Sequence, residues 1–468
     1  MKDRFLKDLG IYGLTTMMVR LINFILIPVY ARVLSQKEYG TMDLVTTITY
    51  VTSVFIFLEL YQAVARFYAE AEQDQRQQIV STGLLYYILA LVPILCFIGL
   101  TRNQLALWFF GDPALGRLLW LAFTASMALA LFNYLQTIQR YALESTAYSI
   151  ANIICVLSTV LVSIWLVVYK LYGLEGVFIG QIVGALAGLV YATNSNLKAL
   201  TNKPDFGLLK KMLIFSAPLT VAAVVLYLMN YIDRWLIKDF LGLDAVGIYA
   251  VMFRIAAVPM LAMNIVSNSL LPHIYREFKE PGRVRELGKL YLLIWVGGCW
   301  MVAVMGLFGN EVIEIMAGSQ YSQYAYLFPI VLISGFLLHF SYLFVGLYLG
   351  DKTYFSAILY ALGLALIFGL NSWLLPIWGI AGAAISSIVT TASILISQWY
   401  FSQKAFYFPI QIVSVLKMAM LSFFPLFILF AIEWSTQEVS IIWRALIAVV
   451  LSLVVAASFR KQLFTQAP

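Results

Sequence analysis

Apolar stretches long enough to cross a bilayer run through this chain from one end to the other. A transmembrane helix needs roughly 20 mostly apolar residues, and by that criterion we count about fourteen stretches. Of the 468 residues, 62% are hydrophobic and 11% are charged, whereas a soluble domain carries about 25% charged residues. The sequence therefore predicts an all-α polytopic membrane protein with about fourteen transmembrane helices, joined by short connections.

The two halves of the chain repeat each other at an offset of 206 or 207 residues. The segment VLSQKEYG resembles FLGLDAVG, and YGLEGVFIGQIV resembles WGIAGAAISSIV. The paired positions are Gly40 with Gly247, Tyr172 with Trp378, and Tyr148 with Tyr354. Because the offset spans six helices, both copies keep one orientation, which makes this a parallel repeat whose lobes rock about a site between them. The predicted parts are an N-terminal six-helix lobe at residues 1–200, a C-terminal six-helix lobe at residues 201–408, and two additional helices with a cytoplasmic tail at residues 409–468.

Basic residues are divided unevenly between the two sides of the predicted helices. The termini and the loops after even-numbered helices hold 18 Lys and Arg residues, against seven on the opposite side. Since cytoplasmic loops carry the basic excess, both termini are predicted to be cytoplasmic. The net charge of +7 then reflects loops at an anionic membrane surface rather than binding to nucleic acid. The first span is too long for a signal peptide, so we expect it to be retained as a helix.

An arginine stands near the middle of the first span. At the bilayer centre it costs about 2.5–3.5 kcal/mol on insertion scales, so it normally faces a bundle interior or a wet cavity. It belongs to a polar stripe at helical spacing, made of Tyr12, Thr16, Arg20 and Asn23. Arg20 either binds an anionic substrate or ties two helices by bonding to backbone carbonyls. Arg254, deep in the eighth span, has the same two interpretations.

Two spans carry candidate coupling carboxylates. Glu59 lies in the second span, seven residues before Arg66, so that the two are predicted to share a helical face. Glu59 either carries a coupling ion or pairs with an arginine, and Arg66 either contacts substrate or snorkels to the surface. Asp233, the second candidate, precedes Arg234 in the seventh span. Adjacent helical residues point about 100° apart, so we expect each to have a separate partner.

The fourth span carries a polar stripe of Asn133, Gln136 and Arg140. These side chains either contact sugar or form hydrogen bonds between helices. His339, the repeat counterpart of Asn133, either titrates or serves as a packing residue. In the sixth span, small residues spaced four apart predict close helix packing. They are Gly180, Gly184 and Gly188.

The sequence lacks the motifs of several common catalytic and cofactor sites. No GxxxxGK[ST], HExxH, CxxC or GxSxG pattern occurs, so we expect neither an enzyme nor a bound cofactor. The three cysteines all lie inside apolar spans, which argues against a disulfide framework and a metal site.

Two segments resemble the polysaccharide transporter family, the oligosaccharide-lipid flippases of the multidrug/oligosaccharidyl-lipid/polysaccharide exporter superfamily. They are YG…R…N…IPVYARVLSQKEYG at the first span and NYIDRWLIKDFLGLDAVGIYAVMFRIA at the seventh and eighth. The resemblance implies a flippase that moves undecaprenyl-diphosphate-linked oligosaccharide, such as an O-antigen repeat unit, from the cytoplasmic to the periplasmic leaflet by alternating access. It further implies a bacterial cytoplasmic membrane protein, monomeric, coupled to a proton or sodium gradient, with polysaccharide polymerase or assembly proteins as partners.

Three other functions compete with this interpretation. A cation-coupled multidrug exporter and a lipid II flippase share the fold, so the fold alone does not decide the substrate. A membrane glycosyltransferase or polymerase would need a large extramembrane catalytic loop, for which the connections are too short. An anionic diphosphate suits arginines, which form bidentate charge-assisted hydrogen bonds. The candidate substrate-binding residues are Arg20, Asn23, Arg66, Asn133, Gln136 and Arg254, and the candidate ion-coupling residues are Glu59 and Asp233.

Overall fold

The computed structural model describes residues 2–195, 202–277, 281–350, 352–408, 412–434 and 440–464. Within these ranges the chain forms helices and no strand. Twelve of the helices are long and apolar enough to cross a membrane. Two further apolar stretches, Val413–Leu426 and Ile441–Ala457, are shorter. The structure therefore confirms a helical multi-pass membrane protein, while the count of fourteen spans stays a prediction.

Two compact units make up the chain, residues 1–231 and 232–468. Each is described here by itself. The predicted lobe boundary near residue 200 stays a prediction, and part of it, residues 196–201, lies outside the described ranges. The division into units falls inside one long helix, α9, Phe206–Leu241.

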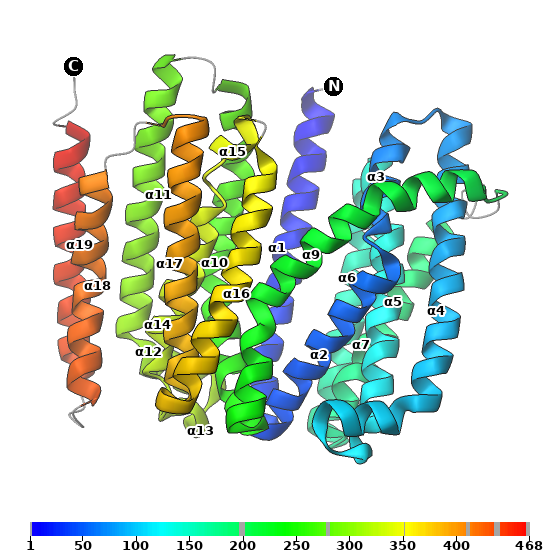
Figure 1. Ribbon diagram of the computed structural model, residues 1–468, viewed down its shortest axis with the longest axis horizontal. Coiled ribbons are helices and arrows are strands. Elements are labelled where there is room, and N and C mark those ends of the chain that lie inside the picture. The colour runs from blue at the N-terminus through cyan, green and yellow to red at the C-terminus, as the bar shows by residue number, and fades with distance from the viewer. Residues whose placement is uncertain are drawn as a thin grey trace. The chain divides into compact units, whose positions relative to one another are not determined.

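The first unit holds the helices up to the first part of α9 (Figure 1). They are α1 (Lys2–Val33), α2 (Gln36–Phe57), α3 (Leu60–Glu70), α4 (Gln73–Phe110), the 3₁₀ turn η1 (Pro113–Leu115), α5 (Gly116–Tyr141), α6 (Ser145–Ile164), the π-helical turn η2 (Trp165–Tyr169) and α7 (Gly173–Ser195). A capping box starts α2, in which the Ser35 hydroxyl accepts from the Glu38 backbone and the Glu38 carboxylate accepts from the Ser35 backbone. This satisfies two backbone donors at the helix start.

The second unit follows from the end of α9. Its helices are α10 (Leu243–Glu277), α11 (Pro281–Leu307), α12 (Gly309–Ala317), α13 (Ser319–Ser322), α14 (Leu327–Ser341), α15 (Gly346–Leu349), α16 (Thr353–Trp378), α17 (Ile380–Ala405), α18 (Ile412–Trp434) and α19 (Ile441–Phe464). The last two pack on α11. Arg444 of α19, which is buried, binds both carboxylate oxygens of Glu311 on α12 at 3.0 Å. Trp295 and Trp300 of α11 donate to α18 and α19, respectively.

The internal repeat is visible in the packing of the two units. In the first unit α5 packs against α2, α4 and α7, and α6 packs against α7. In the second unit α14 packs in the same way against α10, α11 and α17, and α16 packs against α17. A glycine with positive φ stands at the start of the last helix of each set, Gly173 with φ 52° and Gly379 with φ 58°. These two glycines are equivalent under the sequence offset, so a positive φ recurs at the same place in both copies.

Small residues hold α6 and α7 together, as the sequence predicts. A Cβ atom at Gly184 would collide with Thr159 and with the Cys155 carbonyl of α6, and one at Gly180 would collide with Ser163. The counterparts in α17, Ser386 and Thr390, are small and buried as well. These positions therefore serve close helix packing.

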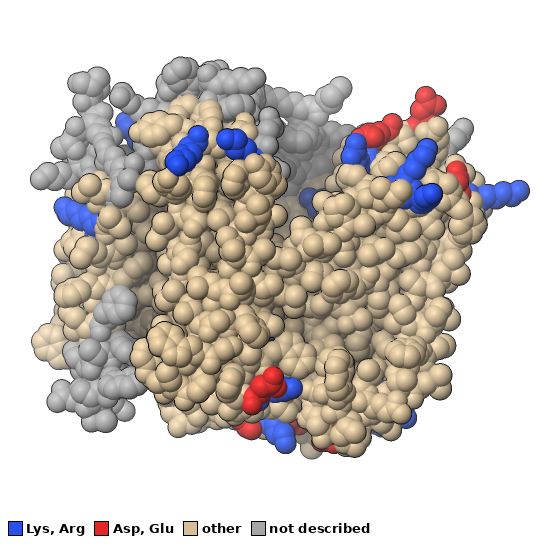
Figure 2. All heavy atoms as spheres, viewed as in Figure 1, with Lys and Arg blue, Asp and Glu red and all other residues tan. Residues whose placement is uncertain are grey.

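Charged side chains gather at the helix ends. On the face shown in Figure 2, Lys, Arg, Asp and Glu of the first unit lie at the two ends of its helices, and uncharged residues cover the middle. A band of this kind suits the hydrocarbon core of a bilayer, which is about 30 Å thick.

Candidate functional site

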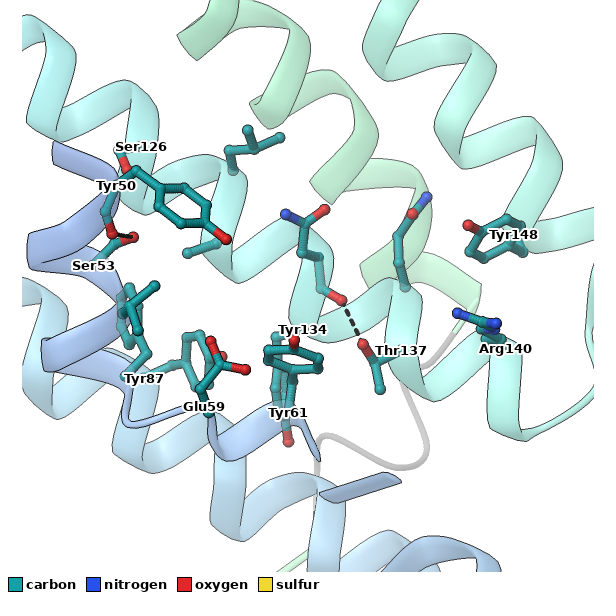
Figure 3. Close-up of a pocket in the computed structure, with 16 residues that line it drawn as sticks. Tyr50, Ser53, Glu59, Tyr61, Tyr87, Ser126, Tyr134, Thr137, Arg140 and Tyr148 are labelled. Carbon is teal, nitrogen blue, oxygen red and sulfur yellow. Dashed lines mark hydrogen bonds between the residues drawn. The ribbon is translucent and has the colours of Figure 1, made fainter. Parts of the chain in front are cut away.

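A cavity of about 350 Å³ lies within the first unit. Its wall is formed by the end of α2, the start of α3, and parts of α4, α5 and α6. Figure 3 shows its polar and aromatic side chains, with Glu59 on one side and Arg140 and Tyr148 on the other. Glu59 and Arg140 are the only two charged groups among the described residues that line it.

Glu59 stands at a break in the second span. Helix α2 ends at Phe57 and α3 begins at Leu60, while Leu58 and Glu59 adopt left-handed φ angles of 49° and 51°. Such angles are strained for residues other than glycine, and strain of this kind clusters at functional sites. The Glu59 side chain is 7% exposed, accepts a hydrogen bond from the Gln62 amide, and lies beside the Tyr61 hydroxyl.

The break overturns the prediction that Glu59 and Arg66 share one helical face. Glu59 belongs to the left-handed turn and precedes the first residue of α3, so the spacing rule for a continuous helix does not apply to it. Arg66 is exposed on α3, pairs with Glu70 at 3.2 Å, and lies 4.7 Å from the ring centre of Phe215. It is not among the described residues that line the cavity.

Helix α5 contributes the polar stripe expected from the sequence. Asn133, Gln136, Thr137 and Arg140 all line the cavity. Gln136 is 6% exposed, and its amide Nε2 has no hydrogen-bond partner among the described residues. A buried donor without a partner costs about 1–3 kcal/mol, and such groups are rare enough to call for an explanation. A ligand that accepts a hydrogen bond from Gln136 would supply the partner.

Tyrosine rings form much of the remaining wall. Tyr87 stacks on Phe57 with a centroid distance of 4.3 Å, and the Tyr134 hydroxyl donates to the Val80 carbonyl at 2.6 Å. Tyr50, at the wall, stacks on Tyr227 of α9 at 4.3 Å. Sequence reasoning missed these residues as site residues. Tyrosines scattered over several spans leave no spacing signal, and the chain is rich in aromatic residues throughout.

The four residues of the polar stripe predicted for α1 do not share one environment. Tyr12 packs edge-on against Tyr148, at a centroid distance of 5.1 Å, on the side of α1 that faces α6. Thr16, Arg20 and Asn23 are exposed. Arg20 and Asn23 are not among the described residues that line the cavity, so their roles in substrate binding stay predictions.

In the second unit, Asp233 and Arg234 bind each other. The Arg234 guanidinium lies 2.9 Å from the Asp233 carboxylate, and the two are 1% and 2% exposed, respectively. The expectation of separate partners for these two side chains is therefore wrong. The guanidinium also lies over the Phe253 ring, 4.5 Å from its centre. Tyr249 lies beside the pair and forms a 3.0 Å hydrogen bond with Ser387 of α17.

Two other candidates of the second unit are only partly exposed. Arg254 is half-buried on α10. The His339 ring is 2.8 Å from the Gly335 carbonyl through Nδ1, which favours the packing interpretation of this histidine. In the described part of the chain, no group of three or more His, Cys, Asp or Glu residues could hold a metal ion.

Comparison with known proteins places the chain in a family. The sequence model of the polysaccharide biosynthesis protein family matches residues 5–278, more than half of the chain. The chain belongs to this family. The capsular polysaccharide biosynthesis protein CapF of Staphylococcus aureus is 24% identical over an alignment of 210 residues, which covers 42% of this chain and 51% of that protein. A putative O-antigen transporter of Shigella flexneri is 23% identical over an alignment of 241 residues, which covers 49% of this chain and 55% of that protein. The matches thus span about half the length of these curated relatives.

Solved structures share the fold along the chain. The lipid II flippase MurJ, in an inward closed conformation, is similar with a TM-score of 0.72 and 14% identity, covering 97% of this chain and 99% of that one. The Vibrio cholerae MATE transporter VcmN is similar with a TM-score of 0.61 and 16% identity, covering 86% and 98%. At these identities the likeness establishes a common fold and leaves the substrate open.

Proposed function

We propose that this protein is a flippase for an undecaprenyl-diphosphate-linked oligosaccharide, moving it from the cytoplasmic to the outer leaflet by alternating access. Membership of the polysaccharide biosynthesis family and relatives named for capsule and O-antigen assembly support a glycan substrate. The observation that carries the proposal is the cavity of the first unit, where amides, hydroxyls and tyrosine rings line a space inside a membrane-spanning bundle. A cavity of this composition suits a sugar, which has hydroxyls at its edge and C–H groups on its faces.

The arginines are proposed to bind the diphosphate. Arg20 is exposed near the middle of an apolar span, which is an expensive place for a charge unless an anion meets it. Arg254 is the candidate from the second unit. A charge-assisted hydrogen bond contributes about 1.5–3 kcal/mol, so losing either arginine weakens binding roughly tenfold or more.

Ion coupling is proposed to involve Glu59 rather than Asp233. Asp233 is engaged with Arg234 in a buried pair, and an engaged carboxylate is a poor site for an exchanging ion. Glu59 lines a cavity and is held at a strained turn. The remaining parts of the proposal are a location in the bacterial inner membrane with both termini cytoplasmic, a monomer, and polymerase or assembly proteins as partners.

A cation-coupled drug exporter is the second candidate. The observation that favours it is the buried carboxylate of Glu59, since a cationic drug would be attracted to it. A lipid II flippase remains a further variant of the first proposal, with a different glycan on the same kind of lipid.

Binding measurements separate these candidates. The protein in nanodiscs is titrated with an undecaprenyl-diphosphate disaccharide and, separately, with a cationic dye. We expect binding of the lipid-linked sugar that falls about tenfold or more in Arg20→Ala and Arg254→Ala, with partial recovery in the two Lys variants, because lysine keeps the charge but lacks the planar fork. Dye binding without lipid-linked sugar binding would instead favour the exporter.

A further inference from the structure

The cavity of the first unit has a charge distribution that a general sugar site does not need. Its one carboxylate, Glu59, is almost fully buried, while its one guanidinium, Arg140, is exposed. The two lie on opposite sides of the cavity in Figure 3. A ligand beside Glu59 therefore meets a negative charge that the wall around it does not neutralise.

The Glu59 carboxylate is fixed in place. The left-handed turn at Leu58 and Glu59 sets the backbone, and the Gln62 amide donates a hydrogen bond to the side chain. An ionised carboxylate offers about four lone-pair sites, so acceptor capacity remains for a ligand. It can accept from hydroxyl, amide or ammonium groups, and it has nothing to donate.

Gln136 adds the complementary function from α5. Its amide Nε2 is buried and has no hydrogen-bond partner in the part of the chain that the structure describes, and the residue lines the same cavity as Glu59. The wall thus offers a fixed acceptor and an unused donor. A sugar ring, with hydroxyls that both donate and accept, satisfies the two together.

The size and the aromatic lining of the cavity limit the ligand further. A space of about 350 Å³ lies at the small end of the roughly 300–1,000 Å³ that ligand pockets span, so it suits a small unit such as a sugar ring rather than a whole repeat unit. Tyr50 and Tyr61 line the cavity and are partly exposed, so their rings offer apolar surface to the C–H faces of a sugar.

We propose that this cavity is a subsite for one sugar residue that carries no carboxylate, and that Glu59 makes it discriminate against acidic sugars. The inference rests on the proposed flippase function and adds a selectivity to it. A uronic acid in the subsite would bring a second carboxylate against a buried one, and apposed like charges suppress the wrong ligand. A neutral or amino sugar meets no such repulsion.

The test compares two lipid-linked sugars that differ at one group. The probes are undecaprenyl-diphosphate disaccharides with identical linkages, ending in glucose or in glucuronic acid. Binding to the full-length protein in nanodiscs is measured without an ion gradient. The readout is the dissociation constant of the glucuronic acid probe divided by that of the glucose probe. We expect the wild type to prefer the neutral probe by about tenfold or more, and Glu59→Gln to bring the ratio close to one.

Two further variants complete the experiment. Glu72→Gln makes the same change at an exposed position outside the described cavity wall, and it should keep the wild-type ratio. Arg140→Gln removes the exposed cation and should raise the ratio, which preserves the test if Glu59→Gln does not fold. A wild-type ratio near one, or a ratio that Glu59→Gln leaves unchanged, would overturn the selectivity while leaving the flippase intact. Binding of neither probe would overturn both.

Discussion

The buried pair of Asp233 and Arg234 allows a stability prediction with a worked magnitude. Both side chains are almost fully buried and 2.9 Å apart. Removing one member of a buried pair leaves an uncompensated charge and costs about 3–5 kcal/mol. The cation–π contact of Arg234 with Phe253 is present in the wild type and remains in Asp233→Leu, so it does not change the difference between them. We therefore expect a loss of about 3–5 kcal/mol.

The matched variants are Arg234→Met and the double variant Asp233→Leu/Arg234→Met. Replacing both members by apolar side chains of similar size is often neutral, so the double variant should recover to within about 1 kcal/mol of the wild type. The assay is reversible unfolding of purified protein in mixed detergent micelles, analysed as a double-mutant cycle. Two single losses that simply add in the double variant would refute the pairing argument. Wild-type stability of Asp233→Leu with loss of gradient-driven transport would make Asp233 a coupling residue instead.

Three further predictions concern packing, the C-terminal helices and topology. Gly184→Leu should destabilise the first unit by about 1–3 kcal/mol or more, because α6 leaves no room for a side chain; a thermal melt like that of the wild type would contradict this. Arg444→Met should lower stability by leaving Glu311 unpaired, but by less than the roughly 3–5 kcal/mol of a fully buried pair, because the Glu311 side chain is 28% exposed. The paired Glu311→Gln/Arg444→Met variant should recover part of the loss. In a cysteine-free background, a cysteine at Asn202 should be labelled only from the cytoplasm and one at Asn103 only from outside, and the reverse would overturn the assigned orientation.

The fold was predictable because its signals are long and periodic. Apolar length identified the spans, and the offset between matched segments identified the repeat. The structure shows this repeat in its helix packing and in the positive φ of Gly173 and Gly379. The polar stripe of α5 was also visible from helical spacing, and three of its members line one cavity. These inferences succeed because they depend on the regular geometry of a helix.

The site was less predictable because it departs from that geometry. Neither Leu58 nor Glu59 is a Gly or Pro, the residues that would signal a break in the helix. The prediction of a continuous helix through them therefore placed Arg66 on the same face as Glu59, which the structure does not bear out. The adjacent pair of Asp233 and Arg234 was misjudged for a related reason. Adjacent residues of a helix are rotated by about 100° about the helix axis, but the arginine side chain is long enough to reach the carboxylate of its neighbour.

A flipping assay tests the central claim most directly. The purified protein is reconstituted in liposomes that contain an undecaprenyl-diphosphate disaccharide in the inner leaflet, and arrival of the sugar at the outer leaflet is followed with an impermeant sugar-modifying enzyme. The account predicts arrival well above that in protein-free liposomes, and a strong reduction with Arg20→Ala protein incorporated in equal amount. Arrival at the protein-free rate, with the wild-type protein correctly inserted, would contradict the account.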